Sequence, residues 1–159
     1  MQSLLGEAPT THLEVMLLPL QTDNLLLPDV MVAEICDGGE ITVKAGSPDW
    51  FVGYANWRGQ SVPLISFEAL NGAMPIAADQ VQQIAVLEST LGHGHLPYYA
   101  VVLSGRPSIL DVSDDQVRSY EGRPRGRAET ISVMIEQKTA GIPNVDWVEQ
   151  HLQTYILHG

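Results

Sequence analysis

Short apolar runs, separated by turn-forming residues, dominate the chain, and few of them keep a helical period. His12–Leu20 and Leu25–Ile35 are apolar, with Gln21–Asn24 between them as a turn. Pro28 requires an edge position or a break inside the second run, because proline donates no hydrogen bond to a sheet. Further strands are predicted over Ile41–Val43, Ser61–Phe67, Val81–Glu88, Pro97–Ser104, Ser108–Val112 and Ile131–Lys138. Strands of this length and number predict a mainly β fold.

Two of these strands are expected to form one hairpin. Val81–Glu88 and Pro97–Ser104 are both rich in β-branched and aromatic residues, and the connection over residues 89–96 is rich in glycine. Glycine adopts the backbone conformations that reversals of direction require. We therefore expect antiparallel pairing of the two strands.

A different spacing occurs at the aromatic residues of segment 50–57. Trp50, Phe51, Tyr54 and Trp57 recur at intervals near three and four, which favours one helical turn. Arg58-Gly59-Gln60 follows as a predicted tight turn. Two of the three tryptophans lie in this segment, so it is expected to anchor the core.

The C-terminal residues have the pattern of an amphipathic helix. Apolar residues recur at helical spacing in this segment, at Val145, Val148, Leu152, Tyr155 and Ile156. Asn144 is a favourable N-cap, and acidic residues in the first turn suit the positive end of the helix dipole. We expect this helix to pack on the β structure.

No linker divides the chain, so residues 12–158 are predicted to form a single domain after a flexible leader at 1–11.

Net charge narrows the classes of partner. Nineteen Asp and Glu residues face eight Lys and Arg residues, giving a formal charge of −11. This balance repels phosphate backbones, so nucleic acid and anionic membranes are poor partners. The N-terminus lacks a secretory pattern and no run approaches the ~20 apolar residues that cross a bilayer, so no membrane insertion is predicted. The single cysteine, Cys36, fits a cytoplasmic location.

Candidate catalytic groups are sparse. Ser104 and Cys36 are possible nucleophiles, but no G-x-S-x-G motif surrounds either, and a strand end and a small core residue are the simpler interpretations. His93 and His95 lie two apart in a glycine-rich segment, without the CxxC or HExxH frame that completes a zinc site. A small hydrolase using Ser104, or a metal enzyme using His93 and His95, is the alternative hypothesis. No catalytic residue, metal or cofactor is predicted.

Two groups of arginines are candidates for partner contacts. Arg118, Arg123, Arg125 and Arg127 lie in or beside a loop, where they either are solvated or receive an acidic partner surface. Arg58 follows Trp57 directly, and both residue types are enriched at binding hot spots. An arginine beside a rigid indole can stack on it. Trp57 is equally compatible with a plain core position, and Arg58 with a plain surface cation.

A run of about forty residues resembles the CheW-like domain of chemotaxis coupling proteins. The matching positions agree in order and spacing, and they are Val32, Glu34 and Ile35; Pro48, Phe51 and Gly53; Asn56, Arg58 and Gly59; and Val62, Pro63, Leu64 and Ile65. The segments Ile84–Leu87 and Tyr99–Leu103 are similar to the paired strands that open the second barrel of that family. Ser66 and Ser104 depart from the acidic residues that the family has at these positions.

The resemblance implies two intertwined SH3-like barrels of five strands each, with a C-terminal helix. The first would span roughly residues 25–75 with terminal elements, and the second roughly 81–135. It also implies a non-enzymatic adaptor that binds the regulatory domain of a CheA-type histidine kinase and the cytoplasmic tip of a chemoreceptor. Arg58, Glu34 and Val32, with Trp57 beside them, match positions tied to these contacts. With these departures the chain is similar to the ChpC-type accessory couplers of pilus chemosensory systems, which control twitching motility.

Overall fold

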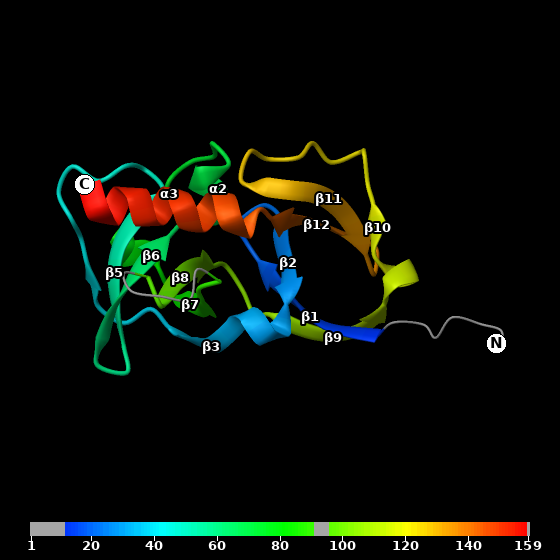
Figure 1. The fold of residues 1–159 in the computed structure, drawn as a ribbon, viewed down its shortest axis with the longest axis horizontal. Helices are drawn as coiled ribbons and strands as arrows, with labels where there is room; N and C mark the ends of the chain where they lie inside the picture. The colour runs from blue at the N-terminus through cyan, green and yellow to red at the C-terminus, as the bar shows by residue number, and fades with distance from the viewer. Residues whose placement is uncertain (1–11, 91–95, 159) are drawn as a thin grey trace.

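Two β-sheets of six strands each form most of the computed structural model, which describes residues 12–90 and 96–158 (Figure 1). The terminal sheet has the order β10-β11-β12-β2-β1-β9 and the central sheet the order β3-β7-β8-β6-β5-β4. The predicted leader and the predicted His93/His95 pair lie outside the described residues.

The terminal sheet contains the first two and the last four of the described strands, and the central sheet contains the six strands between them. The terminal strands are β1 (His12–Pro19), β2 (Asn24–Pro28), β9 (Ser108–Ser113), β10 (Arg118–Ser119), β11 (Glu129–Ile135) and β12 (Lys138–Pro143). The central strands are β3 (Val32–Asp37), β4 (Ile41–Thr42), β5 (Phe51–Trp57), β6 (Gln60–Ile65), β7 (Gln83–Glu88) and β8 (Tyr98–Leu103). The helical elements are η1 (Asp29–Met31), α2 (Phe67–Leu70), η2 (Ala78–Gln80), η3 (Asp114–Gln116) and α3 (Val145–His158).

This arrangement confirms the mainly β fold with a C-terminal helix. Each sheet has six strands rather than five, and each contains one strand of only two residues, β10 or β4. Strands β7 and β8 pair within the same sheet as β3–β6. The barrel bounds of 25–75 and 81–135 stay a prediction. The predicted hairpin is present as antiparallel β7 and β8. Pro28 ends β2, so the chain breaks there before η1 and β3.

The predicted helical turn over residues 50–57 is wrong, because this segment is strand β5. A bulge between Phe51 and Gly53 adds one residue to the strand, and Gly53 has a φ of 151°. The extra residue brings Phe51 and Tyr54 to the same face although they are three apart, so a bulged strand imitates the helical spacing. Both rings contact each other there, with centroids 5.3 Å apart.

Strand β12 was not predicted as a separate element. The hairpin from β11 to β12 turns through Glu136 and Gln137, which both have positive φ, at 49° and 65°. Turns of this kind ordinarily carry Asn and Gly, so the sequence has no turn signal at this point.

Apolar residues form three clusters in the described structure. The largest fills the space between the two sheets and α3, and it includes Leu18, Leu25 and Tyr99. A second lies on the other face of the central sheet around Trp57, and a third lies inside the terminal sheet around Val133. Figure 1 shows α3 running from the end of β12 across the central sheet. None of the described helices is long and apolar enough to span a membrane.

Helix α3 is fixed at its start and in its middle. Asn144 Oδ1 accepts a hydrogen bond from the Trp147 backbone N–H at 3.2 Å, which confirms the predicted N-cap. Glu149 is fully buried, and its carboxylate accepts hydrogen bonds from the hydroxyls of Tyr99 at 2.8 Å and Thr90 at 2.7 Å. Burial, reinforced by the charge of Glu149, raises the pKa of Tyr99, so this phenol remains a donor.

Arg123, one of the four late arginines, belongs to a buried ion-pair network. The guanidinium of Arg123 donates to both carboxylate oxygens of Glu129, at 2.8 and 2.7 Å, and also pairs with Asp23. Its side chain is 13% exposed and that of Glu129 is 1% exposed. A Cβ atom at Gly141 would lie 2.0 Å from a Glu129 oxygen, so only glycine fits beside this carboxylate. The solvated interpretation is therefore wrong for Arg123.

Replacing Arg123 tests how much this network contributes to the free energy of unfolding. We expect Arg123→Met to lower the free energy of unfolding by about 3–5 kcal/mol, because Glu129 then stays buried without a partner cation. The matched control is Arg125→Met at an exposed neighbouring position, which should change stability by less than about 0.5 kcal/mol. Urea denaturation measures both. Equal effects of the two substitutions would show that the network contributes little.

The same network predicts a loss of stability in acid. Burial alone would raise the pKa of Glu129, but hydrogen bonds from Arg123 and the Gly126 N–H outweigh it and hold this pKa below its ordinary value of 4.5. The unfolded chain therefore binds the proton first. The stabilising contribution is present above pH 4.5 and is lost as pH falls through the folded-state pKa. Denaturation at a series of pH values should show this decline in the wild type and a shallower one in Arg123→Met.

Candidate partner-binding site

The site begins at the hairpin that joins β5 to β6. Trp57 pairs with Gln60 across the hairpin, and the two turn residues, Arg58 and Gly59, have φ values of 51° and 78°. Positive φ at both positions defines the type I′ turn that matches the twist of two strands. Arginine is not favoured in this conformation, since a side chain other than that of Gly, Asn or Asp is strained there. The turn itself thus gives no reason for an arginine.

Three predicted residues meet at this hairpin. The indole Nε1–H of Trp57 donates a hydrogen bond to Glu34 Oε1 at 3.0 Å. A guanidinium nitrogen of Arg58 donates to the same oxygen, also at 3.0 Å. The Arg58 guanidinium carbon lies 4.8 Å from the centre of the Trp57 ring, within cation–π distance. We call Glu34, Trp57 and Arg58 the hairpin site.

The hairpin site joins the core to the surface. Trp57 is 6% exposed, whereas the side chains of Arg58 and Glu34 are 67% and 40% exposed. The buried indole therefore has a fixed position, and its N–H orients the carboxylate that holds the guanidinium. Arg58 uses one donor on Glu34, and within the described structure its other N–H groups make no hydrogen bond. A partner that presents carbonyl or carboxylate oxygens can accept from them.

Val32 does not join this group. A bulge between Val32 and Glu34 in β3 shifts the alternation of side chains by one position. Val32 therefore packs against the core between the sheets, while Glu34 faces Trp57 on the other side of the central sheet. Residues at a spacing of two share a face only in a regular strand, and the bulge removes that relation. The family resemblance groups Val32 with Glu34, whereas in the structure they face opposite sides of the sheet.

Tyr98 belongs beside this site and was not predicted. Its ring lies 4.9 Å from that of Trp57, and its side chain is half-buried at the start of β8. Trp57 therefore contacts Arg58 and Tyr98, and all three are of residue types that are common at hot spots. No sequence signal links residues 57 and 98, because the contact arises from the parallel pairing of β6 with β8.

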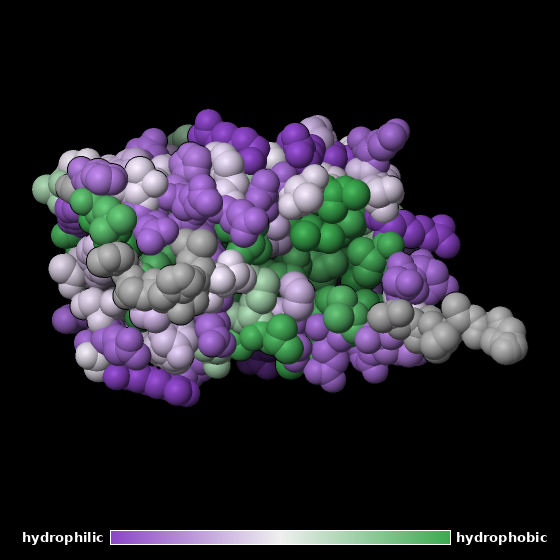
Figure 2. Space-filling view, in the orientation of Figure 1, coloured by the Kyte–Doolittle hydropathy of each residue, from purple (hydrophilic) through white to green (hydrophobic). Residues whose placement is uncertain are grey.

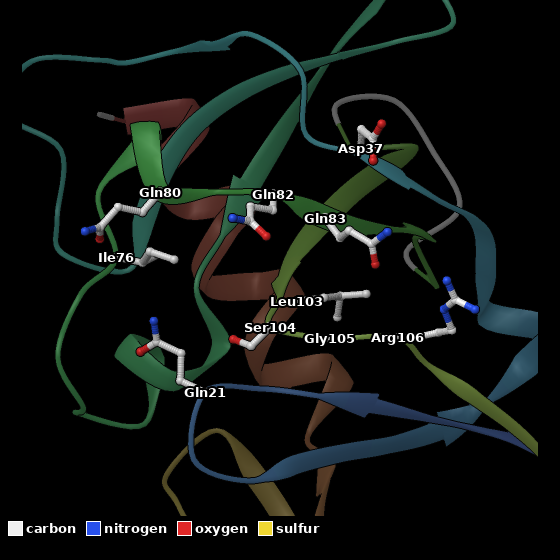
Figure 3. Close-up of a pocket in the computed structure, with 10 residues that line it drawn as sticks. All are labelled: Gln21, Asp37, Ile76, Gln80, Gln82, Gln83, Leu103, Ser104, Gly105 and Arg106. Carbon is white, nitrogen blue, oxygen red and sulfur yellow. The ribbon is translucent and has the colours of Figure 1, made fainter.

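The structure gives no support to catalysis by Ser104. This residue lines a cavity of about 610 Å³ together with Gln21, Gln80, Gln82, Asp37 and Arg106, as Figure 3 shows. Among the described residues no histidine lines it, so these residues offer Ser104 no general base of that type. In the described ranges, no group of three His, Cys, Asp or Glu residues is placed to hold a metal ion.

Cys36 lies in β3 with its side chain partly buried against the core around Trp57. Burial, and then the charge of Glu34, raises the pKa of this thiol, which disfavours the reactive thiolate. This environment agrees with the interpretation of Cys36 as a small core residue rather than a nucleophile.

Comparison with known proteins agrees with this architecture. Residues 14–150 match the family model of the CheW-like domain, and the chain therefore belongs to the CheW-like family. A solved structure, the scaffolding protein TtCheW from Thermoanaerobacter tengcongensis, superposes with a TM-score of 0.67 at 15% sequence identity. The superposition covers 84% of this chain and 90% of that one, and it shows the shared fold of two SH3-like barrels. No curated protein matches the chain.

Substitutions at residue 58 test whether its backbone has the positive φ of the turn. We expect Arg58→Asn to be as stable as the wild type or up to about 1 kcal/mol more stable, since asparagine suits positive φ. Arg58→Val should lose about 1–3 kcal/mol, because a β-branched residue is strained there. Thermal and urea denaturation measure the difference. A valine variant more stable than the asparagine variant would contradict the turn assignment.

Proposed function

We propose that this protein is a non-enzymatic scaffold that couples a chemoreceptor to a CheA-type histidine kinase. Membership of the CheW-like family supports this role, and the solved structure that it resembles is described as a scaffolding protein. The observation that carries the proposal is the hairpin site, where a buried tryptophan and a carboxylate hold an exposed arginine.

The hairpin site suits binding rather than bond-making. A guanidinium presents several N–H donors in a fixed planar arrangement and no acceptor, which suits recognition of an oxygen-bearing partner. Glu34 and Trp57 hold the guanidinium in place before binding, so less side-chain entropy is lost when a partner protein docks. We assign Arg58, Glu34 and Trp57 to partner contact, with Tyr98 beside them. Val32 would contribute to the partner site only through another surface.

The partners follow from the family and the charge. The cytoplasmic tip of a chemoreceptor and the regulatory domain of the kinase are the two proposed partners. A net charge of −11 disfavours nucleic acid, and we place the protein in the cytoplasm beside the receptor tip. The departures at Ser66 and Ser104 favour an accessory coupler of the ChpC type, acting in twitching motility.

Substitution of Arg58 tests the proposal. Arg58→Asn keeps the turn and removes the cation, so binding to the receptor tip or the kinase regulatory domain should weaken by about 1–3 kcal/mol. Arg58→Ala should weaken it similarly. The control is Arg125→Ala, an exposed arginine outside the hairpin site. Calorimetry with purified partners measures the affinities, and circular dichroism checks the fold. Unchanged binding of the Arg58 variants to both partners would refute this assignment.

A further inference from the structure

Asn71 is the C-cap of the short helix α2, and a glycine follows it directly. Asn-Gly occurs once in the sequence, and the other three asparagines precede leucine, tryptophan and valine. Asparagine is chemically labile, and it deamidates fastest before glycine, because glycine has no side chain to hinder attack by its own backbone nitrogen. How long Asn71 persists is therefore decided by the fold around it.

Deamidation at this position is a reaction of the chain with itself. The backbone nitrogen of Gly72 loses its proton and attacks Cγ of Asn71, so that a new N–Cγ bond closes a five-membered ring. The Cγ–Nδ2 bond breaks, and Nδ2 leaves as ammonia with the proton that Gly72 lost. Water then opens the ring at one of its two carbonyl carbons, which leaves aspartate or isoaspartate at position 71. The reaction needs a free Gly72 N–H and a backbone that brings this nitrogen to Cγ.

The backbone of the folded protein meets neither requirement. The Gly72 N–H donates a hydrogen bond to the Ala69 carbonyl oxygen at 2.9 Å. Asn71 has a ψ of 2°, which eclipses the Gly72 nitrogen with the backbone nitrogen of Asn71 itself. A flat five-membered ring requires the Gly72 nitrogen to eclipse Cβ of Asn71 instead. Ring closure therefore needs rotation about the Cα–C bond of Asn71, and this rotation breaks the hydrogen bond to Ala69.

The side chain of Asn71 is held as well. Its Oδ1 accepts a hydrogen bond from the Ala128 N–H at 2.8 Å, and its Nδ2 donates to Glu129 Oε2 at 3.2 Å. The backbone of Gly126 lies against the carboxamide, since a Cβ atom at this glycine would be 2.3 Å from Asn71 Cγ. Arg123 donates to both oxygens of the same Glu129. The Arg123–Glu129 network thus fixes the carboxamide that deamidation would attack.

Exclusion of water does not protect this segment. Figure 2 shows mostly hydrophilic residues along the upper edge of the molecule, where Figure 1 places α2 and the connection from β10 to β11. Asn71 is half-buried, and Gly72 is exposed. Solvent therefore reaches the peptide bond between them, and its protection has to come from the hydrogen bonds of Asn71 and Gly72.

We propose that Asn71–Gly72 is a latent deamidation site, which the Arg123–Glu129 network keeps unreactive in the folded protein. Opening of the network frees the carboxamide to react. The product prevents the return, because a carboxylate at position 71 has no proton to donate to Glu129 and carries the same charge. Glu129 is 1% exposed, so solvent screens this repulsion poorly. Deamidation would thus make a transient opening permanent. The inference is independent of the proposed scaffold function.

Peptide mapping by mass spectrometry tests this on the full chain, after prolonged incubation in mildly alkaline buffer. The mass increase from amide to acid reports conversion at residue 71, and Asn144, which precedes valine, is the internal reference. We expect native wild type to convert at least about tenfold more slowly than the chain unfolded in urea, because only the open fraction reacts. Equal rates in the two states, or no conversion in the unfolded chain, would overturn the proposal.

Two arginine variants test whether the network provides the protection. Arg123→Met should convert at residue 71 at least about tenfold faster than native wild type, because it raises the open fraction, whereas Arg125→Met should convert at the wild-type rate. Circular dichroism checks that both variants are folded. Equal rates in the two folded variants would show that the network does not protect Asn71.

The product itself can be examined without Arg123→Met, which keeps the proposal open to refutation if that variant folds poorly. Asn71→Asp should lower the midpoint of urea denaturation, because it places a second carboxylate beside Glu129. Asn56→Asp, at an exposed position of β5 outside the network, is the matched control and should leave the midpoint in place. An Asn71→Asp variant as stable as Asn56→Asp would contradict the claim that the product prevents the return.

Discussion

The hydrogen bond from the buried indole of Trp57 to the carboxylate of Glu34 is the contact on which the hairpin site depends. An exposed arginine in a turn is ordinarily mobile, and a surface ion pair contributes little to stability. Here one oxygen of Glu34 receives both the indole and the guanidinium, so the position of the cation is set by a residue packed in the core. The guanidinium is therefore held in one position by the fold, as the proposed partner contact requires.

The two sheets of the fold share one core, and the hairpin site lies on the face of the central sheet that looks away from that core. The hairpin site offers the N–H donors of an exposed guanidinium beside an aromatic ring. Helix α3 is fixed across the two sheets through the cap at Asn144 and the hydrogen bonds of the buried Glu149. Such an arrangement agrees with the proposed scaffold role.

Regular elements could be predicted from the sequence, and irregular ones could not. Alternation and turn residues indicate β1, β7, β8 and β9, and spacing with an N-cap indicates α3, because each depends on local preference alone. Bulges at Gly53 and beside Val32 change which side chains share a face, and no local pattern marks them. The result is a false helical signal in β5 and a Val32 that turns away from Glu34.

The ion pairs of Arg123 with residues distant in the sequence could not be predicted either. Arg123 has the sequence context of a solvated loop, yet Asp23 and Glu129 surround it from distant strands. In the hairpin site, Arg58, Trp57 and Glu34 could be grouped because a family resemblance related them, whereas Tyr98 could not, since only strand pairing brings it to Trp57.

The most direct test of the central claim follows the tryptophan indole N–H resonances in a nitrogen–proton correlation spectrum. The chain has three tryptophans, and Trp147 on α3 serves as an internal reference. Titration with the receptor tip or the kinase regulatory domain should shift the Trp57 indole resonance in the wild type and leave that of Trp147 in place. Saturating either partner while the Trp57 resonance stays fixed, or while only Trp147 moves, would contradict the account.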